Sequence, residues 1–203
     1  QLKANLPTHP PVDSLKPLEE DYTGLRILAV HAHPDDESSK GAGTASAYIA
    51  RGARFMVATM TGGERGDILN EEIDKSPRAH RDLPGLRRAE MAAAREIMGI
   101  EHRWIGFFDS GLPEGDPMPP LPFGSFGTMP LDRAAAPLVR LVREYRPHII
   151  ITYDEIGGYP HPDHIMTHKV AVEAFEKAGN PEAYVGEGEP WTPLKLYYDR
   201  AFN

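Results

Sequence analysis

The fold is decided by Ile27-Leu-Ala-Val-His31-Ala-His33-Pro-Asp35-Asp36-Glu37-Ser-Ser-Lys40. The first residues of this stretch form a short apolar run, and apolar runs of this length are typical of buried strands. Two histidines, a proline and three consecutive acids follow at once. Charged groups this dense beside a buried strand cost free energy unless they are paired or bind a cation. The stretch therefore predicts a buried strand whose end carries a metal site.

The residues around this stretch alternate between strand-like and helix-like patterns. The first strand, 26–31, is followed by a helix that begins at the capping residues 35–39 and runs to Gly52. Further strands are predicted at 54–61, 102–108, 149–153 and 194–198, and further helices at about 86–98, at 131–145 and from Pro162 to about Ala178. This order predicts a single Rossmann-like, doubly wound α/β domain. We expect a mostly parallel sheet of strand order 3-2-1-4-5, with helices on both faces.

Three segments lack a helical or strand period. Residues 1–24 are rich in proline and predict an extended N-terminal arm, which leaves the α/β domain at 25–203. The other two segments are 62–85 and 110–130. Irregular stretches of roughly 20 residues inside a compact domain are typical of functional loops. Both follow predicted strands, so we expect both at the same edge of the sheet.

Composition excludes several classes of function. The 203 residues carry a net charge of −8, which argues against sequence-independent nucleic-acid binding. The chain has no cysteine, so a metal site must use imidazole and carboxylate ligands. No apolar segment approaches the roughly 20 residues of a membrane span. The first residues lack the apolar core of a signal peptide. We therefore expect a cytoplasmic protein without a nucleic-acid or membrane partner, and the oligomeric state stays open.

Two histidine segments are predicted to meet at one edge of the sheet. Ligands of doubly wound sheets bind beyond the carboxyl ends of the strands, where the strand order reverses. His33 and Asp36 follow the first strand, and His164 follows the fourth, its neighbour in the predicted order. Two imidazoles and one carboxylate leave a position open for water, as in catalytic zinc sites. Fe²⁺ accepts the same ligands. His31, two residues from His33 on the same strand face, is an alternative ligand.

The acids and histidines beside these ligands predict proton-transfer groups. Asp35 and Asp36 are adjacent, so their side chains diverge and cannot easily share a metal. Asp35 is therefore the candidate general base. His161, when protonated, can stabilise an oxyanion or donate to a leaving amine. Asp163 can orient a flanking histidine, and Tyr159 can hydrogen-bond the same oxyanion.

Substrate contacts are predicted from position alone. A long loop at the rim of a sheet typically carries binding residues, so Glu64 and Arg65 are candidates, with a solvated charged loop as the alternative. Lys40 lies in a first helical turn, where a positive charge is unfavourable. A substrate contact would explain it. His168 is four residues from His164, and we expect an ordinary helix-face residue there.

Four segments of the chain resemble the PIG-L/LmbE-like zinc deacetylase superfamily. They are 31–40, 61–70, 153–164 and 193–198, of which the first contains Ala-His-Pro-Asp-Asp-Glu and the third ends in His-Pro-Asp-His. The resemblance covers nearly everything from Leu25 onward. It implies the same zinc ligands (His33, Asp36 and His164), Asp35 as general base, and His161 as electrophile or acid. It also implies that Asp163 supports His161 and that Tyr159 lies near the reacting carbonyl.

The segments are also similar to the actinobacterial amidases that act on S-conjugates of mycothiol. This likeness implies a zinc-dependent hydrolase for a small thiol–sugar conjugate, whose amide is cleaved to a mercapturate and glucosaminyl-inositol. Lys40 matches this branch and would help select conjugates over an acetylated sugar. Two alternatives remain, a deacetylase of N-acetylglucosaminyl-inositol and a non-catalytic metal- or sugar-binding module. Relatives continue beyond the position of Asn203, which indicates a partial chain or a remodelled pocket.

Overall fold

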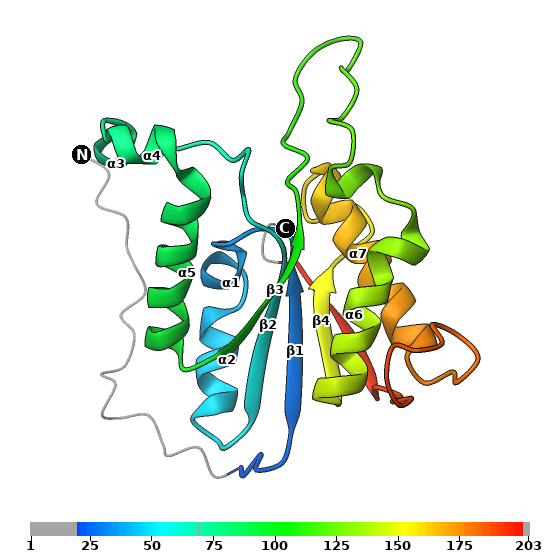
Figure 1. Ribbon diagram of the computed structural model, residues 1–203. Coiled ribbons are helices and arrows are strands. Elements are labelled where there is room, and N and C mark those ends of the chain that lie inside the picture. Colours follow the sequence, from blue (N-terminus) through cyan, green and yellow to red (C-terminus); the bar gives the residue numbers. More distant parts are fainter. Residues whose placement is uncertain (1–19, 69, 201–203) are drawn as a thin grey trace.

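A single parallel sheet organises the described part of the chain. The computed structural model describes residues 20–68 and 70–200, so most of the predicted N-terminal arm lies outside the described residues. The sheet has the order β3-β2-β1-β4-β5, and every neighbouring pair is parallel (Figure 1). The strands are β1 (Arg26–His31), β2 (Arg54–Thr61), β3 (Glu101–Phe107), β4 (Ile149–Tyr153) and β5 (Lys195–Asp199). The predicted fold class and strand order are confirmed.

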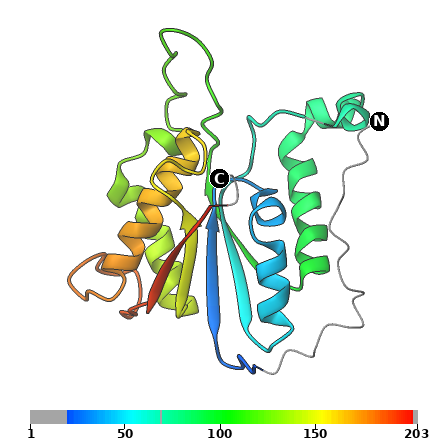
Figure 2. The same cartoon turned by 180° about the vertical axis from the view of Figure 1, so that it is seen from behind.

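Helices cover both faces of this sheet. They are α1 (Asp36–Ser39), α2 (Ala42–Ile49), α3 (Glu71–Asp74), α4 (Pro77–Arg81), α5 (Leu83–Met98), the 3-10 turn η2 (Phe126–Thr128), α6 (Leu131–Tyr145) and α7 (Pro162–Lys177). Helices α2 and α5 lie on one side of the sheet and α6 and α7 on the other, as the opposite views of Figures 1 and 2 both show. None of the helices in the described ranges combines the length and the apolar character needed to cross a bilayer.

Strand β1 is buried on both faces, which explains its continuous apolar sequence. Leu28 and Val30 pack into the core beneath α6 and α7, whereas Ile27 and Ala29 pack beneath α2. Burying one such side chain fully contributes roughly 1.5–3 kcal/mol for Val, Leu or Ile. The chain therefore leaves the sheet after His31 from a rigidly packed position.

The structure differs from the sequence prediction in two helical regions. The helix predicted from 35 to Gly52 is interrupted at Lys40, whose backbone is non-helical, and α2 begins at Ala42. The adjacent Gly41 lowers helix propensity at this point. The predicted irregular stretch 62–85 contains α3 and α4 and the first turn of α5. Asn70 caps α3 by accepting a hydrogen bond from the backbone N–H of Glu72, a capping signal that the prediction overlooked.

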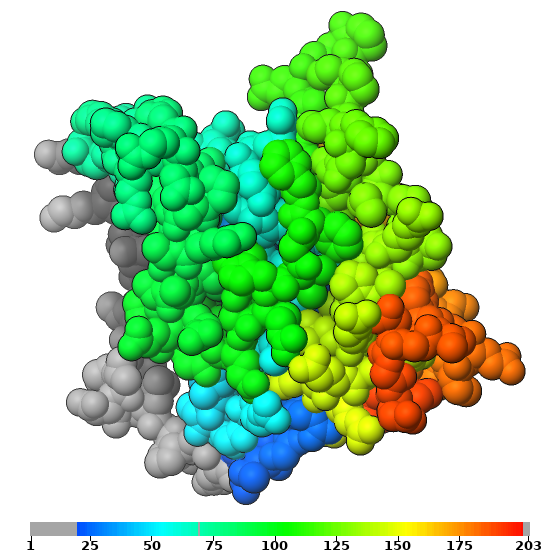
Figure 3. Space-filling view, in the orientation of Figure 1, coloured from blue at the N-terminus to red at the C-terminus, as the bar shows by residue number. Residues whose placement is uncertain are grey.

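The loops that follow β1 to β4 all lie at the carboxyl edge of the sheet. The segment after β3 extends furthest, and in the space-filling view it projects beyond the rest of the surface (Figure 3). Loops at this edge are where doubly wound sheets bind ligands. The fold therefore places the candidate residues of three separate segments, those after β1, β2 and β4, at one rim.

Candidate metal centre and active site

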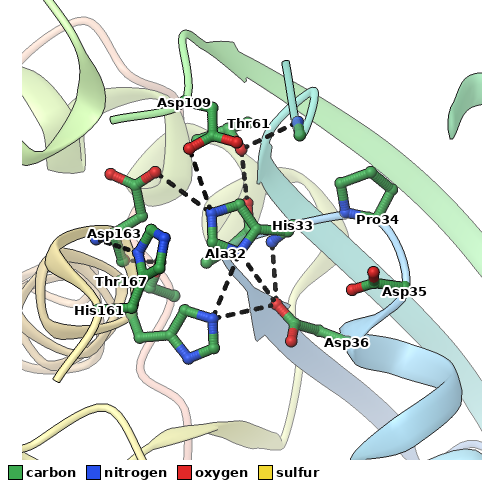
Figure 4. Close-up of polar contacts among 12 residues, drawn as sticks. Ala32, His33, Pro34, Asp35, Asp36, Thr61, Asp109, His161, Asp163 and Thr167 are labelled. Atoms are coloured by element: carbon green, nitrogen blue, oxygen red, sulfur yellow. Dashed lines mark hydrogen bonds and ion pairs between the residues drawn. The ribbon is translucent and has the colours of Figure 1, made fainter. Parts of the chain in front are cut away.

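Three ligand atoms from two distant segments converge at this rim. His33 and Asp36 come from the turn after β1 (Figure 4), and His164 comes from the first turn of α7. Nδ1 of His33 lies 3.3 Å from Nε2 of His164 and 3.8 Å from Oδ2 of Asp36, and the latter two atoms are 3.6 Å apart. Ligands bound at about 2.0 Å to a tetrahedral Zn²⁺ are separated by about 3.3 Å. The donor set and its spacing therefore fit one divalent metal ion.

Hydrogen bonds at the far side of each imidazole favour the tautomer that a metal needs. Nδ1 of His164 lies 2.9 Å from the carbonyl oxygen of Gly157 and donates to it, which leaves Nε2 with a free lone pair. Nε2 of His33 lies 3.2 Å from Oδ2 of Asp163 and 3.6 Å from Oδ1 of Asp109. A proton on Nε2 of His33 leaves Nδ1 for the metal. Such partners orient metal-binding histidines and raise their basicity.

The carboxylates around His33 favour its doubly protonated imidazolium form when no cation is bound. Burial disfavours the imidazolium, but the hydrogen bonds that His33 donates toward the carboxylates of Asp109 and Asp163, with the charge of Asp36, raise the pKa of His33 to about 10. Burial lowers the pKa of His164 to about 4. Burial opposes ionisation of Asp36, but the charges of His164 and other neighbours hold its pKa well below the usual range. The carboxylates therefore stabilise positive charge at His33, and a metal ion bound here would replace the proton on its Nδ1.

Asp36 is held by three donors although only 3% of it is exposed. Its Oδ2 accepts hydrogen bonds from the backbone N–H of His33 at 3.0 Å and from the hydroxyl of Tyr153 at 2.6 Å. Its Oδ1 forms an ion pair with Nζ of Lys40. Lys40 is 8% exposed and lies against the ligand carboxylate. Its predicted contact with substrate stays a prediction.

His161 and Tyr159 lie beside the ligand cluster. His161 caps α7, and its Nδ1 accepts the backbone N–H of Asp163 at 3.1 Å. The neutral ring therefore carries its proton on Nε2. Its ring centroid lies 4.6 Å from that of His33, and the Tyr159 ring lies 4.6 Å from that of His164. Burial, helped by nearby carboxylates, raises the pKa of Tyr159 to about 12. Both side chains are hydrogen-bond donors at neutral pH.

The carboxylate of Asp163 contacts His33, whereas the resemblance implied that it supports His161. Its Oδ2 contacts His33, whereas His161 receives only the backbone N–H of the same residue. Oδ2 also accepts the backbone N–H of Ser110 at 2.9 Å. Asp163 therefore contacts the candidate ligand His33 through its carboxylate and His161 through its backbone N–H, in the turn that begins α7.

Asp35 points away from this buried network. Its side chain is 61% exposed, and Oδ2 accepts a hydrogen bond at 2.6 Å from Nη1 of Arg87 on α5. Nη1 of Arg87 also lies 3.3 Å from the carbonyl oxygen of Pro34. The φ angle of Asp35 is 117°, which is unfavourable for a residue with a side chain. Strain of this kind concentrates at functional sites, and here the side chain of Asp35 is exposed whereas that of Asp36 is buried.

Asp109 belongs to the site and was missed by sequence reasoning. It is buried two residues beyond β3, and its Oδ1 is 3.6 Å from Nε2 of His33 (Figure 4). Glu64 and Arg65 hold it in place. Oε2 of Glu64 accepts the backbone N–H of Asp109 at 3.0 Å, and Oδ2 of Asp109 accepts the backbone N–H of Arg65 at 3.2 Å. The available signal was an acid just after a strand that ends at the same rim.

Two other histidines lie near the cluster without joining the ligand group among the described residues. His31 is buried, and burial lowers its pKa to about 4. It lines a cavity of about 570 Å³ together with Lys40 and residues of α2. His168 donates from Nδ1 to the carbonyl oxygen of Tyr153 at 2.9 Å. It is a helix-face residue that ties α7 to the end of β4.

Comparisons with known proteins show what the sequence and the fold of this chain are similar to. A family model described as GlcNAc-PI de-N-acetylase, PIG-L, matches residues 28–175. The chain is 54% identical over 181 residues to a mycothiol S-conjugate amidase of Streptomyces coelicolor, which covers 88% of this chain and 62% of the relative. It is 41% identical over 185 residues to a 1D-myo-inositol 2-acetamido-2-deoxy-alpha-D-glucopyranoside deacetylase of Streptomyces scabiei, covering 87% of this chain and 56% of the relative.

A solved structure shares the fold. N,N'-diacetylchitobiose deacetylase from Pyrococcus horikoshii superposes with a TM-score of 0.62 at 20% identity, over 80% of this chain and 53% of that one. The chain spans less than two thirds of the length of both curated relatives, 62% and 56%. The family match nevertheless covers the candidate ligand cluster, strands β2, β3 and β4, and β1 from Leu28 onward. The resemblance predicted from the sequence is confirmed, and the chain belongs to the PIG-L family of GlcNAc-PI de-N-acetylases.

Proposed function

We propose that this protein is a zinc-dependent hydrolase that cleaves the amide bond of mycothiol S-conjugates to a mercapturate and glucosaminyl-inositol. The observation that carries the proposal is the triangle of ligand atoms on His33, Asp36 and His164, with separations of 3.3, 3.6 and 3.8 Å. The 54% identity to a mycothiol S-conjugate amidase supports the choice of substrate. The substrate is a small thiol–sugar conjugate.

The residues fit Zn²⁺, with Fe²⁺ as the alternative, because both metals accept two imidazoles and one carboxylate. A divalent ion held by His33, Asp36 and His164 would polarise an amide carbonyl and lower the pKa of a water molecule to about 7. Asp109 and Asp163 keep the second nitrogen of His33 protonated and its ring in place.

The remaining side chains are assigned to proton transfer and charge stabilisation. Asp35 is the general base that removes a proton from the attacking water, and Arg87 holds the turn from which it projects. His161 donates from Nε2 to the oxyanion that forms on the amide carbonyl. Tyr159 donates its hydroxyl to the same oxyanion. Removal of one such donor typically lowers kcat by about 10²–10³-fold.

Substrate selection is assigned to the rim loop after β2 and to Lys40, which forms the ion pair with Asp36. Arg65 is exposed at the rim and Glu64 is half-buried beside it. Both lie at the side of the cluster that Asp109 occupies, where a polyol would find charged hydrogen-bond partners. Lys40 lies at the opposite side, in its ion pair with Asp36. We assign to Lys40 the preference for a conjugate over an acetylated sugar.

The alternative function is deacetylation of N-acetylglucosaminyl-inositol by the same residues, and the 41% identity to a deacetylase favours it as the second candidate. Steady-state kinetics with a mycothiol bimane conjugate and with N-acetylglucosaminyl-inositol separate the two. The proposal predicts a higher kcat/KM for the conjugate. A clear preference for the acetylated sugar would overturn the amidase assignment. Retention of metal with hydrolysis of neither compound would indicate a non-catalytic module.

The role of Asp35 is tested separately by Asp35→Ala. Because Asp35 does not belong to the ligand triangle, the variant is expected to bind the metal with unchanged stoichiometry and to lose turnover. Metal content and amine release are measured on the same preparation. Near-normal turnover would remove the general base from the mechanism while leaving the metal site intact.

A further inference from the structure

We propose that Tyr153 is a positioning residue that fixes two of the three metal ligands at once, Asp36 through its hydroxyl and His164 through its ring. The inference rests on the proposed metal-dependent function. Tyr153 is the last residue of β4, the strand next to β1, and only 1% of it is exposed. It therefore stands between the turn that carries Asp36 and the helix that carries His164.

The hydroxyl of Tyr153 has a defined donor direction. It accepts the backbone N–H of Ala32 at 2.8 Å, and it donates to Oδ2 of Asp36 at 2.6 Å. Because the amide of Ala32 can only donate, the hydroxyl proton is directed to Asp36. The contact fixes the oxygen atom that belongs to the ligand triangle.

The ring of Tyr153 fixes His164 in a different way. The two rings are stacked, with centroids 4.3 Å apart and planes inclined by 15°. The hydrogen bond from Nδ1 of His164 to the carbonyl of Gly157 then sets the rotation of the imidazole within that plane. Two constraints thus determine where Nε2 points. His168 anchors the backbone of Tyr153 to α7 by donating to its carbonyl oxygen at 2.9 Å.

The consequence is a ligand pair whose spacing exists before a metal arrives. Oδ2 of Asp36 and Nε2 of His164 lie 3.6 Å apart. The Tyr153 hydroxyl hydrogen-bonds the first of these atoms, and the Tyr153 ring stacks on the imidazole that carries the second. We expect such a site to need little movement of these two side chains when a metal binds. Loss of an outer partner of a metal ligand typically lowers metal affinity by about 10–100-fold.

Two substitutions distinguish the contribution of the Tyr153 hydroxyl from that of its ring. Tyr153→Phe keeps the stacking on His164 and removes the donor to Asp36, whereas Tyr153→Leu removes both contacts. Tyr145→Phe is the matched control. Tyr145 is 7% exposed on α6, and its hydroxyl lacks a hydrogen-bond partner in the described part of the chain. Its replacement deletes a largely buried phenol oxygen at a distance from the ligands.

The readout is the Kd for Zn²⁺, measured on metal-stripped protein by competition with a chromophoric chelator. The visible spectrum of the Co²⁺-substituted protein reports the ligand geometry. We expect Tyr153→Phe to weaken Zn²⁺ binding by about 10–100-fold, Tyr153→Leu to weaken it further and change the Co²⁺ spectrum, and Tyr145→Phe to match the wild type. A merely structural role would lower the melting temperature of Tyr153→Phe without changing its Zn²⁺ affinity.

The outcomes distinguish this inference from the proposed function. Wild-type Zn²⁺ affinity in folded Tyr153→Phe would overturn the role of Tyr153 and leave the metal site standing. Failure of the wild type itself to bind Zn²⁺ would overturn the proposed function. If Tyr153→Phe does not fold, His168→Ala takes its place, because it releases the carbonyl of Tyr153 without touching Asp36. We expect a loss of Zn²⁺ affinity beyond that of Tyr145→Phe, and its absence would refute the inference.

Discussion

Asp163→Asn removes one negative charge beside His33 while nearly preserving the shape of the side chain. The wild-type carboxylate is fully buried, and its Oδ2 accepts the proton of His33 Nε2 at 3.2 Å and the backbone N–H of Ser110 at 2.9 Å. An asparagine can place its amide oxygen at the same point. The substitution therefore tests the charge on this acceptor with little change in packing.

The magnitude follows from the type of hydrogen bond that is changed. A hydrogen bond to a charged group contributes about 1.5–3 kcal/mol and a neutral one about 0.5–1.5 kcal/mol. The difference is about 1–1.5 kcal/mol, and 1.4 kcal/mol corresponds to tenfold in a dissociation constant. Because the carboxylate raises the basicity of the ligand His33, we expect metal affinity to fall by roughly tenfold.

The assay is competition between the metal-stripped protein and a chromophoric chelator for Zn²⁺. Asp132→Asn serves as the control, because Asp132 is an exposed acid in the first turn of α6. It changes the net charge of the protein by the same amount. An Asp163→Asn protein that binds Zn²⁺ as tightly as this control would refute the reasoning that Asp163 acts on the ligand His33.

Three further predictions concern stability and geometry. Burial and then the charge of Arg95 lower the pKa of His102 from 6.5 to about 4, so the unfolded chain takes up the proton first as the pH falls. The free energy of unfolding should therefore decrease as the pH falls from 6.5 to about 4. In urea unfolding, His102→Gln should show a shallower dependence of this free energy on pH. The same pH dependence in the variant and the wild type would exclude His102 as a cause. Gly157→Ala should lower both the melting temperature and the Zn²⁺ affinity, because the φ angle of Gly157 is +78° and an added Cβ would lie 2.6 Å from Cβ of His164. Wild-type values of both quantities would contradict this prediction. Arg87→Met should lower kcat/KM by roughly tenfold, because the proposed base Asp35 would be misplaced, and it should leave the Zn²⁺ affinity unchanged. A change confined to the Zn²⁺ affinity would show that Arg87 acts on the metal ligands instead.

The sheet and the meeting of the ligand segments were predictable because they follow from rules of topology. Alternating strands and helices predict a doubly wound sheet, and such a sheet brings the ends of β1 and β4 together. The boundaries of all five strands agree with the structure to within one residue at each end. The sequence alone therefore groups His33, Asp36 and His164, although their binding of metal is still a prediction.

The supporting residues were not predictable because their roles depend on side-chain packing. Tyr153 ends an apolar strand, and nothing in its sequence neighbourhood indicates that its hydroxyl faces Asp36. Asp109 is recognised only once β3 places it beside His33. The break in the helix at Lys40 likewise accompanies an ion pair with Asp36 that a sequence pattern does not reveal.

The most direct test of the account is the activity of the metal-stripped protein toward a mycothiol S-conjugate before and after one equivalent of Zn²⁺ is restored. Release of glucosaminyl-inositol is measured in both states, with Asp36→Ala carried through the same cycle. We predict that the stripped wild type is inactive, that one equivalent restores it, and that Asp36→Ala is not restored. Equal activity of the stripped and restored wild type would contradict the assignment of the site.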